Sequence, residues 1–282
     1  MKNKTSEDKY LHLLKKVILN KVYLDDELRL NYLRDCIAGK HDFDYVVYHD
    51  IRAQMREQYN ALERSREIGQ FLQRDIHRSG FSHTMVGQKR LDNLHHCLDH
   101  IRQHSVPGDL VECGVWRGGC CIFMVAYLEL FLIEDRKVFA ADSFDGLPKS
   151  THQEDIFIDL SKETYPELAV SQSTVKENLE SYDLSLDYVE FLQGWFKNTL
   201  PLAPIEKISL LRLDGDLYES TMDCLNALYD KVVEGGIVII DDWVVMPPCK
   251  KAVEDFFENR GEMLPKMTEI DWSAVFWVKG ND

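Results

Sequence analysis

Several features that define other classes of protein are missing from this sequence. No apolar stretch reaches the roughly 20 residues that a membrane-spanning helix needs, because the longest one, residues 120–133, is interrupted by Glu129 and ends at Glu134. The first residues, with charged side chains such as Lys2 and Asp8, lack the apolar core of a signal peptide. We therefore expect a cytoplasmic protein without a membrane partner.

Positive charge is also scarce. The chain has 33 lysines and arginines against 48 aspartates and glutamates, and its formal net charge is -15. A surface with this excess of negative charge repels phosphate backbones, which argues against a nucleic-acid partner. A neutral or cationic small molecule suits such a surface better.

The cysteines do not form a recognisable metal or disulfide pattern. There are seven, an odd number, and no pair has the spacing of a zinc site. Most of them lie inside apolar segments, where a thiol behaves as a small hydrophobic side chain. We expect reduced, buried cysteines.

What the chain does contain is enough apolar sequence for a sizeable core. Of its 282 residues, 45% are hydrophobic, which suits one enzyme-sized domain with an extension. Up to about residue 105 the apolar residues recur at helical spacing, as in Leu91, Leu94, Leu98 and Ile101. The sequence thus predicts a helical N-terminal extension at 1–105 and a catalytic domain at 106–282, with the junction marked by Pro107.

From this junction onward, short β-rich runs alternate with helical patterns. Such alternation indicates a doubly wound α/β fold with a mostly parallel sheet. The expected strands are 109–114, 137–144, 188–192, 208–213, 236–241 and 273–278, and the expected helices are 118–133, 170–181, 219–233 and 249–259. We expect the last strand to be added at an edge of the sheet. The polar stretch 149–168 has no clear period, and both a lid and a plain surface excursion would explain it.

In open parallel sheets, ligands bind beyond the carboxyl ends of the strands. The first such end here is Glu112–Gly119, where Gly114 and Gly118 allow a tight turn into a helix. A dinucleotide-binding turn would require glycine where this chain has Trp116. The bulky side chain argues against a pyrophosphate and favours a cofactor without phosphates.

Asp142 ends the next strand. An acidic residue two dozen positions after the glycine turn suits the two hydroxyls of a ribose. An aspartate that only caps a loop or helix is the structural alternative.

Four aspartates follow two further strands. Asp214 and Asp216 come after 208–213, and Asp241 and Asp242 end 236–241. Brought together, these carboxylates would repel one another, and a divalent cation with oxygen ligands would relieve that repulsion. The sequence therefore predicts a magnesium-type site, with salt bridges to Arg212 or Lys250 as the structural alternative.

With these motifs, the chain resembles the macrocin O-methyltransferase family, which methylates sugar hydroxyls of natural products. The matching blocks are Ser82–Met85, Arg90–Leu94, Glu112–Gly119, Asp142–Pro148, Phe191–Pro201 (FLQGWFKNTLP), Leu211–Thr221 (LRLDGDLYEST) and Ile239–Asp242. They occur in the family's order across roughly residues 80–260. The resemblance implies a class I methyltransferase (Rossmann-like) fold with a mostly parallel seven-stranded sheet, S-adenosylmethionine and Mg²⁺.

The resemblance also implies roles for individual residues. Glu112 and Gly114 would line the methionine part of S-adenosylmethionine, Asp142 and Ser143 would hold its ribose, Gly194 and Trp195 would border its adenine, and Thr84 and Met85 would cap the site. Trp116 and Asp214 complete the expected cofactor contacts. Asp214, Asp241 and Asp242 would bind the metal, and Asp216 would act as the general base.

The expected reaction is O-methylation of a hydroxylated, glycosylated small molecule. A catechol or phenol O-methyltransferase would use the same carboxylates and is the alternative enzyme; a catalytically idle cofactor-binding module is the alternative outside enzymes. We also expect the helical extension to contribute to a homo-oligomer.

His96, His100 and His104 share one helical face. These histidines could bind a metal, or they could simply form a solvated face of the helix, and the sequence leaves both interpretations open. His83 either shapes the site or caps a turn.

Overall fold

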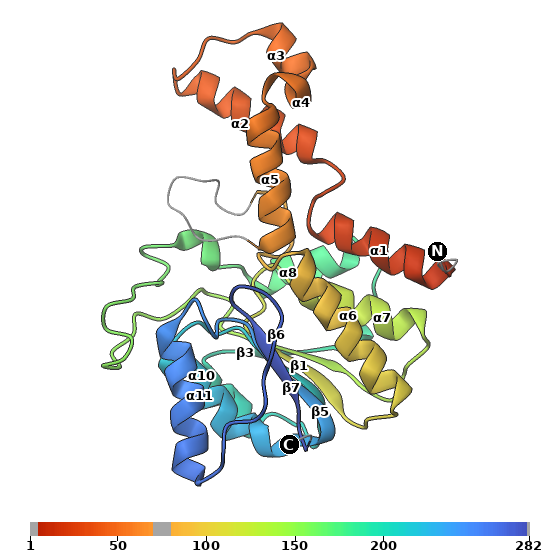
Figure 1. Ribbon diagram of the computed structural model, residues 1–282, viewed down its shortest axis with the longest axis vertical. Coiled ribbons are helices and arrows are strands. Elements are labelled where there is room, and N and C mark those ends of the chain that lie inside the picture. The colour runs from red at the N-terminus through yellow and green to blue at the C-terminus, as the bar shows by residue number, and fades with distance from the viewer. Residues whose placement is uncertain (1–4, 70–79, 281–282) are drawn as a thin grey trace. The chain divides into compact units, whose positions relative to one another are not determined.

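The computed structural model describes residues 5–69 and 80–280, and the chain divides into two compact units, Met1–Lys89 and Arg90–Asp282 (Figure 1). The unit boundary lies sixteen residues before position 105, where the sequence changes its periodicity. Helix α6 (Gln88–Gln103) consequently falls almost entirely in the second unit. Within the described residues, no helix is both long and apolar enough to span a membrane.

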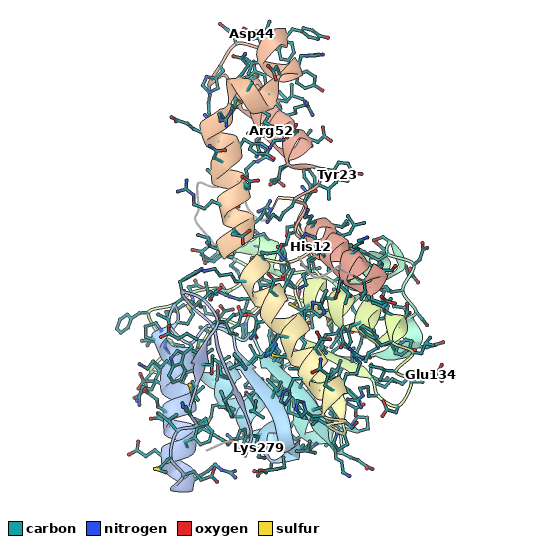
Figure 2. The ribbon with its side chains drawn as sticks, turned by 45° about the vertical axis from the view of Figure 1, so that its right-hand side comes forward. His12, Tyr23, Asp44, Arg52, Glu134 and Lys279 are labelled. Atoms are coloured by element: carbon teal, nitrogen blue, oxygen red, sulfur yellow. The ribbon has the colours of Figure 1, made fainter. Side chains whose placement is uncertain are left out.

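The first unit is helical. Its helices are α1 (Ser6–Ile18), α2 (Leu24–Ile37), α3 (Tyr45–His49), α4 (Ile51–Gln54) and α5 (Arg56–Ile68). A capping box starts α1, in which the Thr5 side chain accepts a bond from the Asp8 amide and Asp8 accepts one from Thr5. Helices α2, α4 and α5 bury a small core of their own around Leu28, Ile51 and Leu62, and the Arg52 guanidinium lies 4.3 Å from the centroid of the Tyr59 ring (Figure 2).

A buried ion pair links two helices of this first unit. The Arg66 guanidinium donates to both carboxylate oxygens of Glu27, at 2.6 and 2.8 Å, and Asn20 donates to the same carboxylate at 2.8 Å. Both charged side chains are almost completely shielded from solvent. Losing one partner would leave an uncompensated buried charge, so this pair fixes how α5 packs against α2.

The second unit contains a seven-stranded sheet in the order β3-β2-β1-β4-β5-β7-β6. Its strands are β1 (Asp109–Cys113), β2 (Val138–Asp142), β3 (Val189–Gln193), β4 (Ile208–Leu213), β5 (Val232–Ile240), β6 (Thr268–Glu269) and β7 (Val275–Val278). Neighbours from β3 to β5 are parallel, and β7 is antiparallel to both β5 and β6. The predicted mostly parallel, seven-stranded α/β fold is confirmed.

The prediction of an edge position for the last strand was wrong. Strand β7 lies between β5 and β6, and the two-residue strand β6 forms the edge. Strand β6 was not predicted, because two exposed residues carry no periodicity. Burial of Val275 and Trp277 follows from this internal position.

Helices cover both faces of the sheet. Helices α10 (Tyr218–Leu228) and α11 (Pro247–Arg260) pack on one face, where the apolar core includes Leu211, Val238 and Phe256. Figure 1 shows α6, α7 (Gly119–Leu130) and α8 (Gln172–Glu180) on the other side. Short elements complete the unit: α9 (Phe196–Thr199) and the 3-10 turns Pro166–Leu168, Leu186–Tyr188, Leu200–Leu202 and Tyr229–Lys231.

Lys279 secures the end of the chain next to β5. The Lys279 side chain, labelled in Figure 2, donates from its ammonium group to the carbonyl oxygens of Tyr229 and Val232, at 3.0 and 2.8 Å. These bonds satisfy carbonyl groups just before the strand's regular part. The start of β5 is thereby held at the end opposite to its polar tip.

Candidate active site

Three neighbouring strands end at one edge of the sheet and carry polar residues there. The register pairs Glu112 with Arg212 across β1 and β4, and Leu213 with Ile240 across β4 and β5. Asp214 therefore follows its strand level with Asp241, as the backbone bond from the Asp241 amide to the Leu213 carbonyl shows. Level positions on neighbouring strands bring the Asp214 and Asp241 side chains together, and Asp242 follows directly in the turn after β5.

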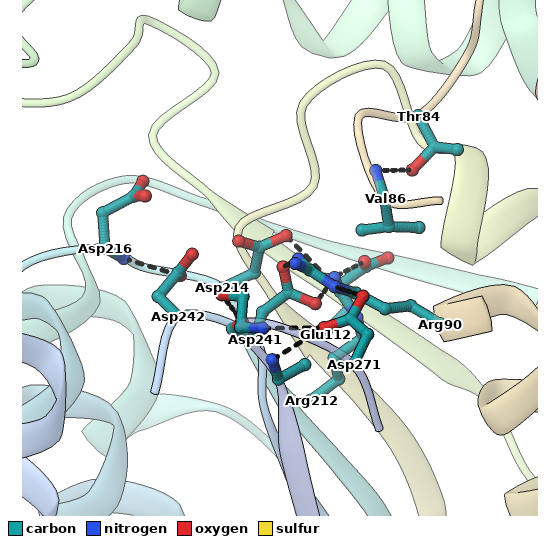
Figure 3. A network of polar contacts seen from close by, with 12 residues as sticks. Thr84, Val86, Arg90, Glu112, Arg212, Asp214, Asp216, Asp241, Asp242 and Asp271 are labelled. Carbon is teal, nitrogen blue, oxygen red and sulfur yellow. Dashed lines mark hydrogen bonds and ion pairs between the residues drawn. The ribbon is translucent and has the colours of Figure 1, made fainter. Parts of the chain in front are cut away.

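Asp214, Asp241 and Asp242 each turn one carboxylate oxygen toward a common point. The three atoms lie within 4.8 Å of one another (Figure 3). Burial, and then the charge of Asp241, raises the pKa of Asp214. This donor set of hard oxygen atoms fits a divalent cation such as Mg²⁺, which usually completes its coordination with water and substrate.

Arg212 lies beneath this cluster in the buried strand β4. One terminal nitrogen is 2.8 Å from Glu112 and 2.9 Å from Asp214, and the other is 2.6 Å from Asp241. The side chain is almost completely buried (3% exposed). The salt bridges of the structural alternative are therefore present, because Arg212 binds oxygens of two of the three clustered aspartates. The cluster of oxygen donors expected of a metal site is present as well.

Arg90, at the start of α6, supplies a second positive charge. Its guanidinium pairs with Asp241 and, at 2.9 Å, with Asp271. It also lies 5.4 Å from the centroid of the Trp272 ring. Burial would lower the pKa of this guanidinium, but Asp241 and Asp271 raise it, so the group keeps its charge.

The pKa values of Asp241 and Asp242 are shifted in opposite directions. Burial, and then the neighbouring Asp216 carboxylate, raises the pKa of Asp242 well above its ordinary value. Burial acts in the same direction on Asp241, yet the Arg212 and Arg90 guanidinium groups hold the pKa of Asp241 below its ordinary value. A bound cation would favour the ionised form of both.

Asp216 has an unusual backbone conformation at the start of the turn into α10. Its φ is 59°, in the left-handed region that side chains other than glycine rarely adopt. The amide donates to Asp242 at 3.3 Å. Burial, followed by the charges of Asp214 and Asp241, raises the pKa of Asp216 to about 7.

The glycine turn after β1 brings two strand ends into close contact. Gly114 has a φ of 93°, and a β-carbon added to it would lie 1.8 Å from the Asp214 carbonyl oxygen. Only glycine permits this approach. The neighbouring Trp116 is held by a 2.9 Å bond from its indole nitrogen to the Glu167 carbonyl oxygen.

Asp142 binds the same turn. One oxygen accepts bonds from the amides of Val115 and Trp116, at 2.7 and 3.3 Å, and the other accepts a 2.9 Å bond from the Phe144 amide. The Ser143 hydroxyl also lies 3.3 Å away, but its single proton has a closer acceptor, the Gly146 carbonyl oxygen at 2.6 Å. A carboxylate accepts about four hydrogen bonds, so the three amide bonds match the loop-capping alternative and leave about one acceptor position for a ribose hydroxyl.

A hollow of about 250 Å³ lies beside the tips of β2 and β3. It is lined by Trp195 and by residues of the loop after β2 and of segment 149–168, including Leu147, Pro148 and Lys162. Trp195 keeps 38% of its surface exposed, and the Gly194 amide donates to the Asp142 carbonyl. An exposed indole at a hollow offers a stacking surface.

The two other expected cofactor contacts belong to the first unit. Thr84 is buried, and its hydroxyl accepts a 3.3 Å bond from the Val86 amide; Ser82 closes the turn by donating to the Thr84 carbonyl at 2.5 Å. The His83 amide donates to the Ile18 carbonyl at 2.8 Å. The capping roles of Thr84 and Met85 stay predictions.

The histidines of α6 do not gather ligands. The His100 and His104 rings stack on each other, with centroids 4.1 Å apart. In the part of the chain that the structure describes, the group of side chains that could hold a metal ion is the aspartate cluster, and these histidines form no such group. All seven cysteines are unpaired, as expected, and Cys121 donates to Glu112 at 2.8 Å.

The sequence, compared with known proteins, identifies the family to which this site belongs. A profile of macrocin-O-methyltransferase (TylF) matches residues 7–279. The chain belongs to the macrocin-O-methyltransferase family.

Relatives of this methyltransferase agree with the assignment. It is 46% identical over 201 residues to a demethyldecarbamoylnovobiocin O-methyltransferase of Streptomyces niveus, covering 70% of this chain and 76% of that protein. It is 40% identical over 275 residues to the 8-demethyl-8-(2,3-dimethoxy-alpha-L-rhamnosyl)-tetracenomycin-C 4'-O-methyltransferase of Streptomyces olivaceus, covering 96% and 93%. The structure of the O-methyltransferase NovP is similar with a TM-score of 0.76 and 38% identity, covering 95% of this chain and 97% of that one.

The resemblance inferred from the sequence blocks is thus confirmed. The methyltransferase has the class I sheet and uses S-adenosylmethionine to methylate an oxygen. Neither arginine was predicted as a site residue from the sequence, where Arg212 was only an alternative ion-pair partner and Arg90 had no role. A charged residue within the otherwise apolar strand Ile208–Leu213 was the available signal for Arg212. Lys250, the other suggested partner, pairs instead with Glu254 at 3.7 Å.

Proposed function

We propose that this methyltransferase transfers the methyl group of S-adenosylmethionine to a sugar hydroxyl of a glycosylated natural product, with the help of Mg²⁺. The observation that carries the proposal is the cluster of Asp214, Asp241 and Asp242, whose oxygens lie within 4.8 Å of one another. Carboxylates this close repel each other. Arg212 and Arg90 offset part of that repulsion, and a divalent cation would offset the rest.

The names of the relatives support the sugar acceptor. One relative methylates a dimethoxyrhamnosyl group of a tetracenomycin, as its name states, and aligns with 96% of this chain. Sugar hydroxyls are very weak acids, and coordination to a divalent cation lowers the pKa of a bound hydroxyl by several units. The acidic cluster and a sugar substrate therefore fit together chemically.

In this proposal Asp214, Asp241 and Asp242 hold the cation, and the two arginines orient them. Arg212 fixes one oxygen of Asp241 and one of Asp214. Both carboxylates thus keep a defined orientation. Arg90 binds the second oxygen of Asp241, so a cation would share an Asp241 oxygen with an arginine. Preorganised ligands of this kind reduce the cost of binding the cation and the acceptor.

Asp216 is the proposed general base. Its pKa, raised to about 7 by burial and by the neighbouring charges of Asp214 and Asp241, suits a group that takes up a proton near neutral pH. The hydroxyl proton would pass to the Asp216 carboxylate while the oxygen forms a bond to the methyl carbon. The bond between that carbon and the cofactor's sulfur would break, and S-adenosylhomocysteine would leave. Holding donor and acceptor about 3 Å apart supplies much of the remaining acceleration.

The cofactor would lie along the tips of β1, β2 and β3. Glu112 and Gly114 would line its methionine part, Asp142 and Ser143 its ribose, and Trp195, at the hollow, its adenine. We further propose that Trp116, Gly194 and Asp214 contact the cofactor and that Thr84 and Met85 cap it. Substituting Trp195 by alanine should weaken S-adenosylmethionine binding in calorimetry, because it removes the stacking surface.

The decisive test is Asp216→Asn. This variant should bind S-adenosylmethionine and Mg²⁺ almost as tightly as the natural chain, yet lose turnover by about 10²-fold or more, because general-base catalysis contributes this much. The matched control is Asp230→Asn, which removes a carboxylate that is 71% exposed and pairs with Arg260. A natural rate in Asp216→Asn would refute the base assignment.

A catechol or phenol acceptor is the alternative for the same site. Two neighbouring phenolic oxygens bind a cation well, so the aspartate cluster alone does not separate the two classes. We expect deoxysugar glycosides to be methylated and simple catechols to be poor substrates when both are assayed by mass spectrometry. The reverse preference would move the protein to the phenol class.

We also propose the division into an extension at 1–105 and a catalytic domain at 106–282, and a lid at 149–168. Several large apolar side chains of the first unit are exposed, among them Tyr10, Leu13 and Val17 of α1. This observation supports the proposal that the extension contributes to a homo-oligomer.

A further inference from the structure

Asp155 is completely buried although it lies in the polar segment 149–168. Its two carboxylate oxygens accept bonds from the backbone amides of Tyr218, at 2.8 Å, and Glu219, at 3.2 Å. The Ser150 hydroxyl donates a further bond at 3.2 Å. Segment 149–168 thus contributes a buried carboxylate that binds the first turn of a helix 63 residues further along the chain.

Helix α10 needs this partner because its own sequence does not cap it. The residue before the helix is Leu217, whose side chain makes no capping bond. The first amides of a helix have no partner inside it, and negative charge at this end is favoured by the helix dipole. Asp155 satisfies both requirements from a distance, where a Ser, Thr, Asp or Asn at the capping position would ordinarily do so.

A second contact holds the same two segments together. The rings of His152 and Tyr218 stack with centroids 4.4 Å apart and an angle of 7°. The Tyr218 hydroxyl donates to Asp255 of α11 at 3.0 Å. Segment 149–168, the start of α10 and α11 are therefore connected through one tyrosine.

Helix α10 begins two residues after Asp216. The turn between them is tight, since the Leu217 amide contacts the Gly215 carbonyl at 2.6 Å, and Asp216 itself has a φ of 59°. An aspartate persists in this conformation only when its surroundings hold it there. On one side Asp242 binds the Asp216 amide; on the other, Asp155 binds the amides two and three residues further on.

We propose that Asp155 is a positioning residue for methyl transfer: by binding the first turn of α10, it holds the strained turn that presents Asp216 to the acceptor. The inference rests on the proposed role of Asp216 as the general base. It gives segment 149–168 a second task beside covering the site, because the base is held in place only while this segment is bound to α10.

The experiment compares Asp155→Ala, Asp155→Asn and the neighbouring Glu154→Gln, which removes the same charge from a carboxylate that is hydrogen-bonded to Gln153. Asp155→Ala should lower kcat by about 10²-fold, as a displacement of about 1 Å in a catalytic group does, and leave the affinity for S-adenosylmethionine unchanged in calorimetry. Asp155→Asn retains an acceptor oxygen and should recover part of the rate. Glu154→Gln should behave as the natural chain.

Two further measurements distinguish positioning from loss of structure. Asp155→Ala introduced into Asp216→Asn should not lower the residual single-turnover rate further. Both substitutions remove the same contribution to the rate, which is proton removal by a correctly placed Asp216. Trypsin should cleave after Lys149 or Lys162 faster in Asp155→Ala, as judged by mass spectrometry, while the melting transition stays cooperative.

An unchanged kcat in Asp155→Ala and Asp155→Asn would overturn the inference, as would a full multiplicative loss in the double variant. The proposed function fails by a different result. If Asp216→Asn alone keeps the natural rate, Asp216 is not the base, whatever the Asp155 variants do.

Discussion

At Glu112 the chain places a carboxyl group between the Arg212 guanidinium and the Cys121 thiol, with almost no access to water. Burial raises the pKa of Glu112 to about 7, although Arg212 acts in the opposite direction. A buried acid of this kind is retained where its charge or its oxygens are needed. Here the oxygens orient Arg212 and face the proposed site of the cofactor's methionine part.

The raised pKa of Glu112 predicts a pH-dependent stability. In the unfolded chain this group titrates near its ordinary value of 4.5 and in the folded protein near 7. Between these values the folded state binds more protons, so the free energy of unfolding should fall as the pH rises from about 4.5 to about 7. Glu112→Gln should flatten this decline by on the order of 1–3 kcal/mol, measured by urea unfolding across the pH range; an identical pH profile in both proteins would contradict it.

The aspartate cluster predicts a dependence on a divalent cation. Asp242→Asn replaces one of the three carboxylates by a neutral amide, and we expect this loss of negative charge to weaken Mg²⁺ binding in calorimetry by at least tenfold. EDTA should stop methyl transfer by the natural chain, and added Mg²⁺ should restore it. Asp230→Asn again serves as the control, and full activity of a verified metal-free enzyme would disprove the role of the cluster.

At the scale of the elements, the site depends on how closely β1 and β4 approach each other. The turn after β1 contacts the end of β4 at the Asp214 carbonyl, where a single methyl group has no room. This contact connects the residues at the end of β1 that are proposed to bind the cofactor with the residue after β4 that is proposed to bind the cation. A change in the separation of these two strand ends would therefore affect both functions together.

Gly114→Ala tests this coupling. The added β-carbon would meet the Asp214 carbonyl oxygen at 1.8 Å, so we expect a loss of several kcal/mol in stability or a clear weakening of both S-adenosylmethionine and Mg²⁺ binding. Gly261→Ala is the matched control: its φ is 66°, and an added β-carbon would meet nothing within 4 Å. It should cost only about 1 kcal/mol and leave both affinities unchanged. Equal effects of the two substitutions would show that backbone strain alone, and not the strand contact, matters.

At the scale of the whole molecule, the exposed apolar side chains of α1 predict self-association. Tyr10, Leu13 and Val17 share one exposed stripe of the helix, and Leu13 keeps 55% of its surface in water. Apolar residues gathered on one face commonly mark an interface.

Sedimentation equilibrium should therefore give at least a dimeric mass, and Leu13→Glu should shift it toward the monomer without altering the melting transition. Lys16→Gln, which changes the net charge by the same amount at another exposed position of α1, should have no effect. A monomer at all concentrations would remove the oligomer from the proposal.

The sequence by itself determined the class of fold and most of the chemistry at the strand ends. Helical and strand periods, the glycines of the first turn and the acidic ends of two strands are local patterns, and local patterns can be read without tertiary contacts. The six strand runs predicted from them all occur in the sheet, although β5 begins at Val232, before the predicted residue 236.

Only the tertiary structure decided which of these groups meet. Strand register placed Asp214 level with Asp241, brought Arg212 of an apolar strand to both, and engaged Asp142 with the glycine turn. Strand pairing also moved β7 inside the sheet and left β6 at its edge. Asp155 reaches the first turn of α10 from 63 residues away. Such contacts depend on pairing energies between distant segments, and a sequence window contains only one partner of each pair.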